Sequence, residues 1–275
     1  MKFLKINPSA VFILALILCT SIGSAQKNKA DNAGFVKIFN GENWDGWYLK
    51  LRNNDAEMAK EIFAIENEMV HVFKGAPDSL DLGTGENGTH GLFYTKKKYS
   101  KYILRFDYKW GEKIANNFER WQYDAGVYYH VTDDKIWPTG IEYQVRYNQV
   151  TDKNHTGDLI RPKGVQYDWY SVPEGDSYLH PKAGGVLDET KSWLHFASPT
   201  ENHNALNGQW NHCEIIVMGS EYTIHKLNGD VVNMAFNLNP SEGIIGFQSE
   251  TAEIYYRNIE IKEFTEIIPV EKFLK

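Results

Sequence analysis

One segment of the sequence places three long polar side chains at alternate positions. Glu142, Gln144 and Arg146 alternate with aliphatic and aromatic residues, which is typical of a strand with one apolar face and one polar face. A carboxylate flanked by an amide and a guanidinium could remove a proton from a bound substrate while its neighbours bind polar substrate atoms. The same pattern also occurs on sheets whose polar face is merely solvated, so both interpretations stay open.

A second alternating segment, residues 125–131, comes shortly before the first. If the two segments pair through the nine-residue loop Thr132–Gly140, Tyr128 and His130 lie on the same face as Glu142. A histidine there could give or take a proton near neutral pH, although an exposed strand histidine is an equally good interpretation. Tyr128 and His130 are therefore candidate substrate-binding residues.

The alternation is interrupted by the loop-rich segment Asn148–Gln209, which contains four prolines and four histidines. So long a loop is usually functional or disordered, and its aromatic residues favour packed loops that cover one face or rim of the fold. Within it, His155 and Asp168 could each serve as an acid, a base or a metal ligand. Together with Glu142 they would suit a divalent metal ion. No short metal-binding motif occurs, however, and the sequence requires no cofactor.

Further polar and aromatic residues could contact a sugar. Gln248 could hydrogen-bond a hydroxyl group, and Arg257 could bind an anion, although its strand neighbours indicate a core-facing position. His225 lies next to a hairpin turn and has no clear face. Indole rings stack on pyranose rings where they are exposed and otherwise pack in the core. Four such residues lie in or beside loops: Trp121, Trp137, Trp169 and Trp193.

These residues need a scaffold of short strands. Period-two alternation recurs between turn signals, and Asn228-Gly229 between two runs is a strong hairpin signal. No long amphipathic helix and no internal repeat is present. Short strands without crossover helices predict an all-β antiparallel sandwich or barrel in a single domain, built from the runs 62–73, 104–110, 125–131, 141–147, 213–217, 222–227, 231–236, 244–248 and 254–261.

Amino-acid composition and charge indicate a globular protein that does not bind nucleic acid. The chain has 275 residues, of which 42% are hydrophobic and 24% charged, so it can bury a full core. The formal net charge is −7, and the sequence contains no basic stripe. A nucleic acid is therefore not expected as a partner.

Residues 1–25 have the three-part layout of a secretory signal peptide. Two lysines in Met1–Lys5 precede the apolar run Ala10–Leu18, and Gly23–Ala25 offers small residues before a cleavage point. The run is short for a membrane span. We therefore expect an exported protein, periplasmic or extracellular, without a stable membrane anchor after cleavage. Cys19 would suit a lipoprotein signal, but the large residue before it disfavours lipidation.

Cleavage would leave a short tail at residues 26–34 and a single cysteine, Cys213. One cysteine forms no internal disulfide, so the mature protein must be held by its core. Cys213 lies in a strand-like run without basic neighbours that would favour a thiolate, and we expect it to be packed rather than nucleophilic.

Several motifs, in order along the chain, resemble the DUF1080 family. Ile38–Gly41 followed by Trp44–Trp47 is similar to its opening LFNGKDLSGW, and GIEYQV at residues 140–145 is similar to its central GxExQ strand. Later segments are similar to its LYD, GEWN, HxLNG, GLQ and FRNI elements, at residues 166–170, 208–211, 225–229, 246–248 and 257–259. The resemblance predicts one domain over residues 35–265, followed by a C-terminal tail at 266–275.

The resemblance implies a concanavalin A-like, jelly-roll β-sandwich that acts on 3-keto-glycosides as a hydrolase, or as a lyase and hydratase. A ketone at C3 acidifies the C2 proton, so a base can form an enolate. The C1 substituent then leaves by β-elimination, and water adds to the product. This route needs a base, a group that stabilises the enolate and an acid. It also needs a separate oxidoreductase to supply the keto sugar, since no dinucleotide-binding motif occurs here.

On this resemblance Glu142 is the expected base, with His155 and Asp168 as further catalytic candidates. Tyr167 matches the tyrosine of the LYD element and is a candidate for substrate binding. Many relatives carry a His-Gly pair between the GLQ and FRNI elements, whereas this chain reads SETAE at Ser249–Glu253. A role that depends on that histidine therefore does not carry over to this chain.

Two other functions stay open. The same sandwich could be a non-catalytic carbohydrate-binding module, in which truncation of Glu142 would alter affinity alone. It could also be a conventional glycoside hydrolase, which needs a second carboxylate on the Glu142 face. The strand offers Gln144 where that carboxylate would lie, which weakens this alternative.

Overall fold

The computed structural model describes residues 33–75, 89–115, 121–190 and 192–274. The predicted signal peptide (1–25) and most of the predicted tail (26–34) lie outside the described residues. Lys37–Lys275 forms one unit by its internal contacts. Within the described part of the chain, no helix is both long enough and apolar enough to cross a membrane.

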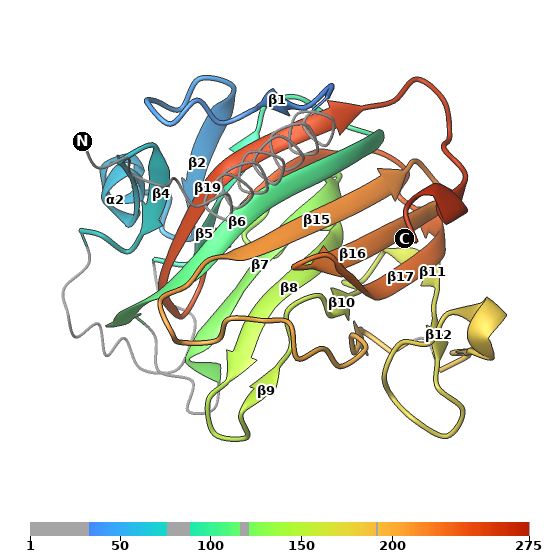
Figure 1. The fold of residues 1–275 in the computed structure, drawn as a ribbon. Coiled ribbons are helices and arrows are strands. Elements are labelled where there is room, and N and C mark those ends of the chain that lie inside the picture. The colour runs from blue at the N-terminus through green and yellow to red at the C-terminus, as the bar shows by residue number, and fades with distance from the viewer. Residues whose placement is uncertain (1–32, 76–88, 116–120, 191, 275) are drawn as a thin grey trace, which may run out of the picture. The chain divides into compact units, whose positions relative to one another are not determined.

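The strands of the first sheet are antiparallel and come from both halves of the chain. They are β3 (Phe63–Glu66), β4 (Met69–Val72), β6 (Lys101–Ile114), β11 (Gln166–Asp168), β15 (Asn211–Met218), β16 (Tyr222–Leu227), β17 (Asp230–Asn239) and β19 (Ala252–Glu263). Their order across the sheet is β11-β17-β16-β15-β6-β19-β4-β3. Figure 1 shows β15, β6 and β19 side by side in this layer.

The second sheet is also antiparallel. It contains β2 (Trp47–Leu51), β5 (Gly91–Thr95), β7 (Tyr123–Val131), β8 (Ile141–Asn148), β10 (Leu159–Ile160), β14 (Leu194–His195) and β18 (Ile244–Ser249). The order is β14-β10-β8-β7-β18-β5-β2, and β9 (Lys153–Asn154) also pairs with β8. The first sheet also includes β1 (Val36–Lys37), which pairs with β19. The remaining elements are α2 (Ala56–Ile62), β12 (Tyr170–Ser171), η2 (Pro181–Ala183), β13 (Val186–Leu187) and η3 (Val270–Lys272).

Aromatic side chains fill the space between the two sheets. Phe247 of β18 is fully buried and stacks on Phe93 of β5, with the ring centroids 4.9 Å apart. From the other sheet, Phe106 of β6 and Tyr256 of β19 each contact Phe247 edge-on, at 5.2 Å. Because side chains alternate along a strand, the neighbours of these core residues point to the outer faces. The predicted all-β antiparallel sandwich is confirmed.

The predicted runs correspond to strands, whereas β2 and β5 of the second sheet were not predicted. Asn228 and Gly229 form the turn between β16 and β17, and both have positive φ angles, 49° and 94°, as a two-residue hairpin turn requires. The predicted run at 62–73 begins instead at the end of helix α2. Asp55 caps this helix by accepting hydrogen bonds from the backbone N–H groups of Glu57 and Met58.

The end of the chain packs against the core. Tyr222 of β16 donates a hydrogen bond from its hydroxyl to the carbonyl of Ile268. Phe273 and Leu274 are partly buried against core residues. The segment predicted as a C-terminal tail (266–275) is therefore anchored on the sandwich over its described residues.

Candidate active site

Strands β7 and β8 carry several of the candidate polar residues on one face. In their antiparallel pairing Tyr128 lies opposite Glu142, and Asp124 lies opposite Arg146. Side chains alternate along each strand, so these four point away from the core. The predicted pairing of the two segments is confirmed. It also adds Asp124, a carboxylate that the sequence analysis did not single out.

Gly126 makes room for the carboxylate of Glu142. It lies between Asp124 and Tyr128 on β7, opposite Gln144. A Cβ atom at this position would lie 2.0 Å from Oε1 of Glu142 and 2.8 Å from its Cδ. The carboxylate therefore lies across the middle of β7, directly over the glycine.

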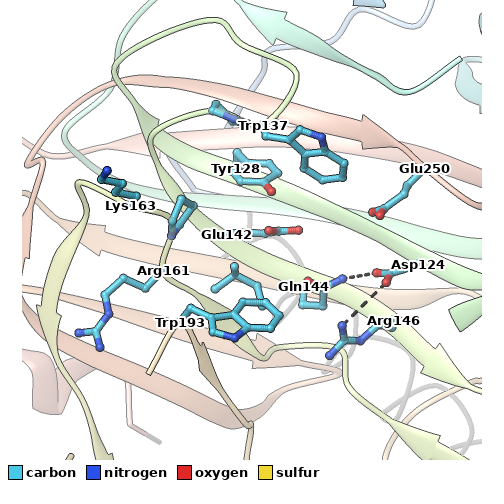
Figure 2. A pocket seen from close by; sticks show the side chains of 13 residues that line it. Asp124, Tyr128, Trp137, Glu142, Gln144, Arg146, Arg161, Lys163, Trp193 and Glu250 are labelled. Atoms are coloured by element: carbon cyan, nitrogen blue, oxygen red, sulfur yellow. Dashed lines mark hydrogen bonds and ion pairs between the residues drawn. The ribbon is translucent and has the colours of Figure 1, made fainter. Parts of the chain in front are cut away.

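These side chains form the floor of a pocket of about 440 Å³ (Figure 2). Its walls come from loops: Trp137 between β7 and β8, Ile160–Lys163 from the end of β10, and Trp193 before β14. Trp137 and Trp193 are 44% and 63% exposed, and Figure 2 shows them on opposite sides of Glu142. Aromatic walls above a polar floor suit a sugar ring, which has apolar faces and hydroxyl edges.

Glu142 is almost completely buried, with 4% of its surface exposed. Burial raises the pKa of its carboxyl group to about 8, although a hydrogen bond with Tyr128 lowers this pKa. The charge of Asp124 raises the same pKa, and Arg146 lowers it. A carboxylate whose pKa lies near the working pH is well matched to proton transfer as a general base.

Asp124 is the carboxyl that pairs with Arg146. Gln144 donates a hydrogen bond from Nε2 to Oδ1 of Asp124, and Nη1 of Arg146 lies 3.8 Å from Oδ2. Burial raises the pKa of Asp124 to about 7, whereas Arg146 and Gln144 favour its charged form. The guanidinium of Arg146 also packs on the ring of Trp121 at 4.2 Å, a cation–π contact.

His155 supports this pair from outside the described pocket lining. Its Nδ1 lies 2.9 Å from Oδ2 of Asp158. The same oxygen lies 3.5 Å from Nη2 of Arg146, and Asp158 also accepts a hydrogen bond from the backbone of Ala197. His155 is therefore placed to position Arg146, and the catalytic role that the resemblance suggested stays a prediction.

Glu250 is a further carboxyl in the pocket lining, and it comes from the turn between β18 and β19. Before it, Ser249 donates its hydroxyl to a backbone carbonyl beside β5, at 2.9 Å. After it, Oγ1 of Thr251 accepts from the N–H of Asp124 at 2.7 Å and lies 3.0 Å from its carbonyl. Burial, followed by the charges of Asp124 and Glu142, raises the pKa of Glu250 well above its usual value.

Replacing Thr251 by valine is expected to lower the free energy of unfolding by about 1–3 kcal/mol, because the buried N–H of Asp124 loses its acceptor. Chemical denaturation of the two proteins measures the difference. Thr190→Val is the control, since Thr190 is exposed and bonds Asp188 on the surface. Its expected change is within about 0.5 kcal/mol. Equal changes in the two variants would contradict the role of Thr251.

Comparison with known proteins identifies the family to which the chain belongs. The sequence matches the family model described as 3-keto-alpha-glucoside-1,2-lyase-like domain over residues 34–262. The chain belongs to this family. The match confirms the resemblance to DUF1080, whereas no curated protein matches the sequence.

Solved structures share the fold of this lyase-like domain. A candidate glycosyl hydrolase from Parabacteroides distasonis ATCC 8503 is 21% identical, with a TM-score of 0.51 over 86% of this chain and 96% of that chain. A second candidate glycosyl hydrolase from the same organism is 16% identical, with a TM-score of 0.51 over 84% and 99%. The two-sheet antiparallel sandwich that the sequence predicted is thus shared with these structures.

In this lyase-like domain Asp168 lies apart from Glu142. It is on β11, the edge strand of the first sheet, where its Oδ2 accepts a hydrogen bond from Asn237 at 2.5 Å. Tyr167 bonds His195 there, with its hydroxyl 2.9 Å from Nδ1. Asp168 and Tyr167 line a second pocket, of about 780 Å³. The described linings of the two pockets share the segment 161–163 alone.

The predicted metal ligands are not brought together. Glu142 lies on the pocket floor, His155 lies behind Arg146, and Asp168 lies on the other sheet. Among the described residues, no group of three or more His, Cys, Asp or Glu side chains is placed to hold a metal ion. Glu142, His155 and Asp168 therefore do not form the metal site that the sequence left possible.

Two predicted histidines lie in the interior. His130 has a φ of 52°, at the point where the register between β7 and β18 shifts. This conformation turns its ring towards the carbonyls of Pro240 and Ser100, at 2.9 and 3.3 Å, and burial lowers its pKa to about 4. The prediction that His130 shares the face of Glu142 is wrong. His225 bonds Tyr129 between the sheets, and burial lowers its pKa to about 3.

The last two predicted residues lie outside the described pocket lining. Arg257 is on the first sheet, where its Nε lies 3.2 Å from Asp107 and its guanidinium packs 3.8 Å over Trp210. Gln248 follows Phe247, which pairs with a residue of β7, so its side chain points to the outer face beside Gly126. Gln248 is buried there, and its Oε1 has no hydrogen-bond partner among the described residues.

Proposed function

We propose that this chain is an exported enzyme that cleaves 3-keto-glycosides by proton abstraction at C2, β-elimination at C1 and hydration. Family membership supports a 3-keto-glucoside as the class of substrate. The observation that carries the proposal is the buried carboxylate of Glu142, held over Gly126 on the pocket floor. A base of raised pKa beneath two exposed indoles suits abstraction of a weakly acidic C–H proton from a sugar ring.

The proposed reaction consumes one water molecule, one proton of which ends on the departed C1 substituent, and it needs no oxidant or reductant. Glu142 takes the C2 proton, and the C–H electron pair forms a C2–C3 double bond as the ketone becomes an enolate. The enolate then collapses to an enone, and the C1 substituent leaves with the electron pair of its bond. Water adds at C1 while a proton returns to C2, so the net reaction is hydrolysis. Tyr128 and Arg146, on the same face as Glu142, supply hydrogen-bond donors for the enolate oxygen.

The remaining parts of the pocket are assigned to substrate binding. Trp137 and Trp193 would stack on the sugar ring, and Gln144, Arg161 and Lys163 would bind its hydroxyl groups. The keto group must be made by a separate oxidoreductase. We also propose that the predicted signal peptide directs the chain to the periplasm or the extracellular space.

Incubation of the chain from residue 26 onward with a 3-keto-glucoside and with its unoxidised parent tests this function. Release of the C1 substituent is expected from the keto compound alone, because the parent lacks an acidic C2 proton. In D₂O the hydrated product is expected to carry deuterium at C2. A parallel incubation with a chelator reports on metal dependence. No release from the keto compound would refute the proposal.

A conventional glycoside hydrolase is the second candidate, because the pocket holds Asp124 and Glu250 as well as Glu142. Such an enzyme uses one carboxyl as an acid and another as a nucleophile or base. It would release product from the unoxidised parent without deuterium at C2. Saturable sugar binding without release from either compound would instead indicate a carbohydrate-binding module.

A further inference from the structure

The elimination step leaves one carboxyl of the pocket without a role. Glu250 lines the pocket together with Asp124 and Glu142, and Figure 2 shows its carboxylate directed into the pocket towards them. A carboxyl in this place loses its hydration and meets two groups of like charge. Such a group destabilises the fold when it is ionised, so it is favoured there in its protonated form.

The turn that carries Glu250 is fixed in place. Ser249 bonds a backbone carbonyl beside β5, and Thr251 bonds both backbone groups of Asp124. These bonds tie the residues on either side of Glu250 to two different strands. Glu250 is therefore held in the pocket, although a loose turn would let its carboxyl move into solvent. A carboxyl that a fixed turn carries into an unfavourable place is typical of a functional residue.

The three carboxyls have different electrostatic surroundings. Asp124 has Arg146 and Gln144 as partners for its charged form. Burial acts on Glu142 as well, and its pKa is raised to about 8. Glu250 experiences burial together with the charges of both other carboxyls, and Arg146 offsets them in part. Carboxyls whose pKa values are pushed apart in one site divide into proton donor and proton acceptor.

We propose that Glu250 is the general acid that protonates the departing oxygen at C1. The inference rests on the proposed function, because it assigns a residue to the elimination step. As the C1–O bond breaks, its electron pair stays on the leaving oxygen, and the carboxyl proton of Glu250 passes to that oxygen. The resulting Glu250 carboxylate then takes a proton from the water that adds at C1, which restores the acid. Glu142, whose carboxyl proton exchanges with solvent after the elimination, protonates C2 in the same step.

The test compares two substrates that differ in their leaving group, the methyl and the 4-nitrophenyl 3-keto-glucosides. Methoxide needs a proton to leave, whereas 4-nitrophenolate leaves without one. Glu250→Gln is expected to lower kcat on the methyl compound by about 10²-fold, the usual size of a general-acid contribution. On the 4-nitrophenyl compound we expect less than about a fivefold change, since the acid is not needed there.

The outcomes separate the inference from the function on which it rests. Equal losses on both substrates, at an unchanged melting temperature, would show a structural role for Glu250 and overturn the inference. Failure of the unsubstituted protein on both substrates would overturn the proposed function instead. Glu142→Gln serves as the comparison, because loss of the base must lower both rates.

A second variant and a second measurement keep the test decisive if Glu250→Gln does not fold. Glu250→Asp retains a carboxyl at shorter reach, so it is expected to lose activity on the methyl compound alone. In the unsubstituted protein, kcat across a series of aryl and alkyl leaving groups is expected to depend weakly on leaving-group pKa. A steep dependence would mean that no acid assists departure, and would overturn the inference.

Discussion

Glu142→Gln is expected to lower kcat/KM on a 3-keto-glucoside by about 10³–10⁴-fold, near the upper range for loss of a general base. Glutamine keeps the size of the side chain, and its amide does not accept the C2 proton. Because Glu142 is buried and its carboxyl is costly to ionise, the melting temperature is not expected to fall. Rates at several substrate concentrations and a thermal melt measure the two effects.

The control for this variant is Glu57→Gln, on helix α2, whose side chain is 82% exposed and pairs with Lys60 on the surface. It is expected to leave kcat/KM unchanged. Turnover by Glu142→Gln within tenfold of the unsubstituted protein would remove Glu142 from the mechanism. A change in sugar affinity without any turnover in either protein would favour a binding module.

The same residue predicts the pH dependence of the reaction. Burial raises the pKa of Glu142 to about 8, so its carboxyl is mostly protonated at pH 7. Only the ionised form acts as a base, and kcat/KM is therefore expected to rise with pH and to level off above about pH 8. The residual activity of Glu142→Gln is expected to lack this rise. A flat profile in the unsubstituted protein would contradict the assignment.

Gly126→Ala is expected to lower kcat/KM by about 10²–10³-fold, although Gly126 contacts no substrate in the proposed reaction. A methyl group at this position would lie 2.0 Å from Oε1 of Glu142, so the carboxylate must move by more than an ångström. Misplacement of that size commonly costs about 10²-fold in rate. The side chain that must move is flexible at its end, and the folded structure is expected to survive.

Gly111→Ala is a closely matched control. A methyl group there would lie 2.1 Å from Oε2 of Glu253, the same kind of contact on the first sheet. Glu253 accepts hydrogen bonds from the backbone of Glu112 and bonds His71, so this variant is expected to lose stability and to keep its kcat. Parallel melts and rate measurements on the two variants separate the effects. A loss of kcat in both would mean that Gly126 acts through the fold.

The strand pattern of the sequence predicted much of the pocket floor. Alternation predicted that Glu142, Gln144 and Arg146 share one face. The short loop between residues 125–131 and 141–147 predicted that these two segments pair, which brings Tyr128 to the same face. Asp124 has the same parity as Tyr128 and lies one residue before the predicted run 125–131. These residues could be predicted because the direction of a side chain on a strand depends on its parity alone.

The residues that the sequence did not place correctly lie where the alternation of side chains along a regular strand does not apply. His130 has the parity of Tyr128, but its left-handed backbone turns the ring to interior carbonyls. Asp168 follows a loop whose path a sequence pattern does not fix, and that path leads to the opposite sheet. Glu250 lies in a turn, where no period indicates direction, and its place depends on bonds to residues far along the chain.

The shifted pKa values of the pocket carboxyls alter the net charge of the native protein. The formal value of −7 counts each carboxyl as ionised and each histidine as neutral. In the folded chain burial raises the pKa of Glu142 to about 8 and that of Glu250 well above its usual value, which favours the protonated forms of both carboxyls. His212 is charged near neutral pH, because hydrogen bonds to Asp107 and Glu214 raise its pKa to about 9. The native protein is therefore less negative than its sequence indicates, and it migrates in an electric field as a less acidic protein than its unfolded chain.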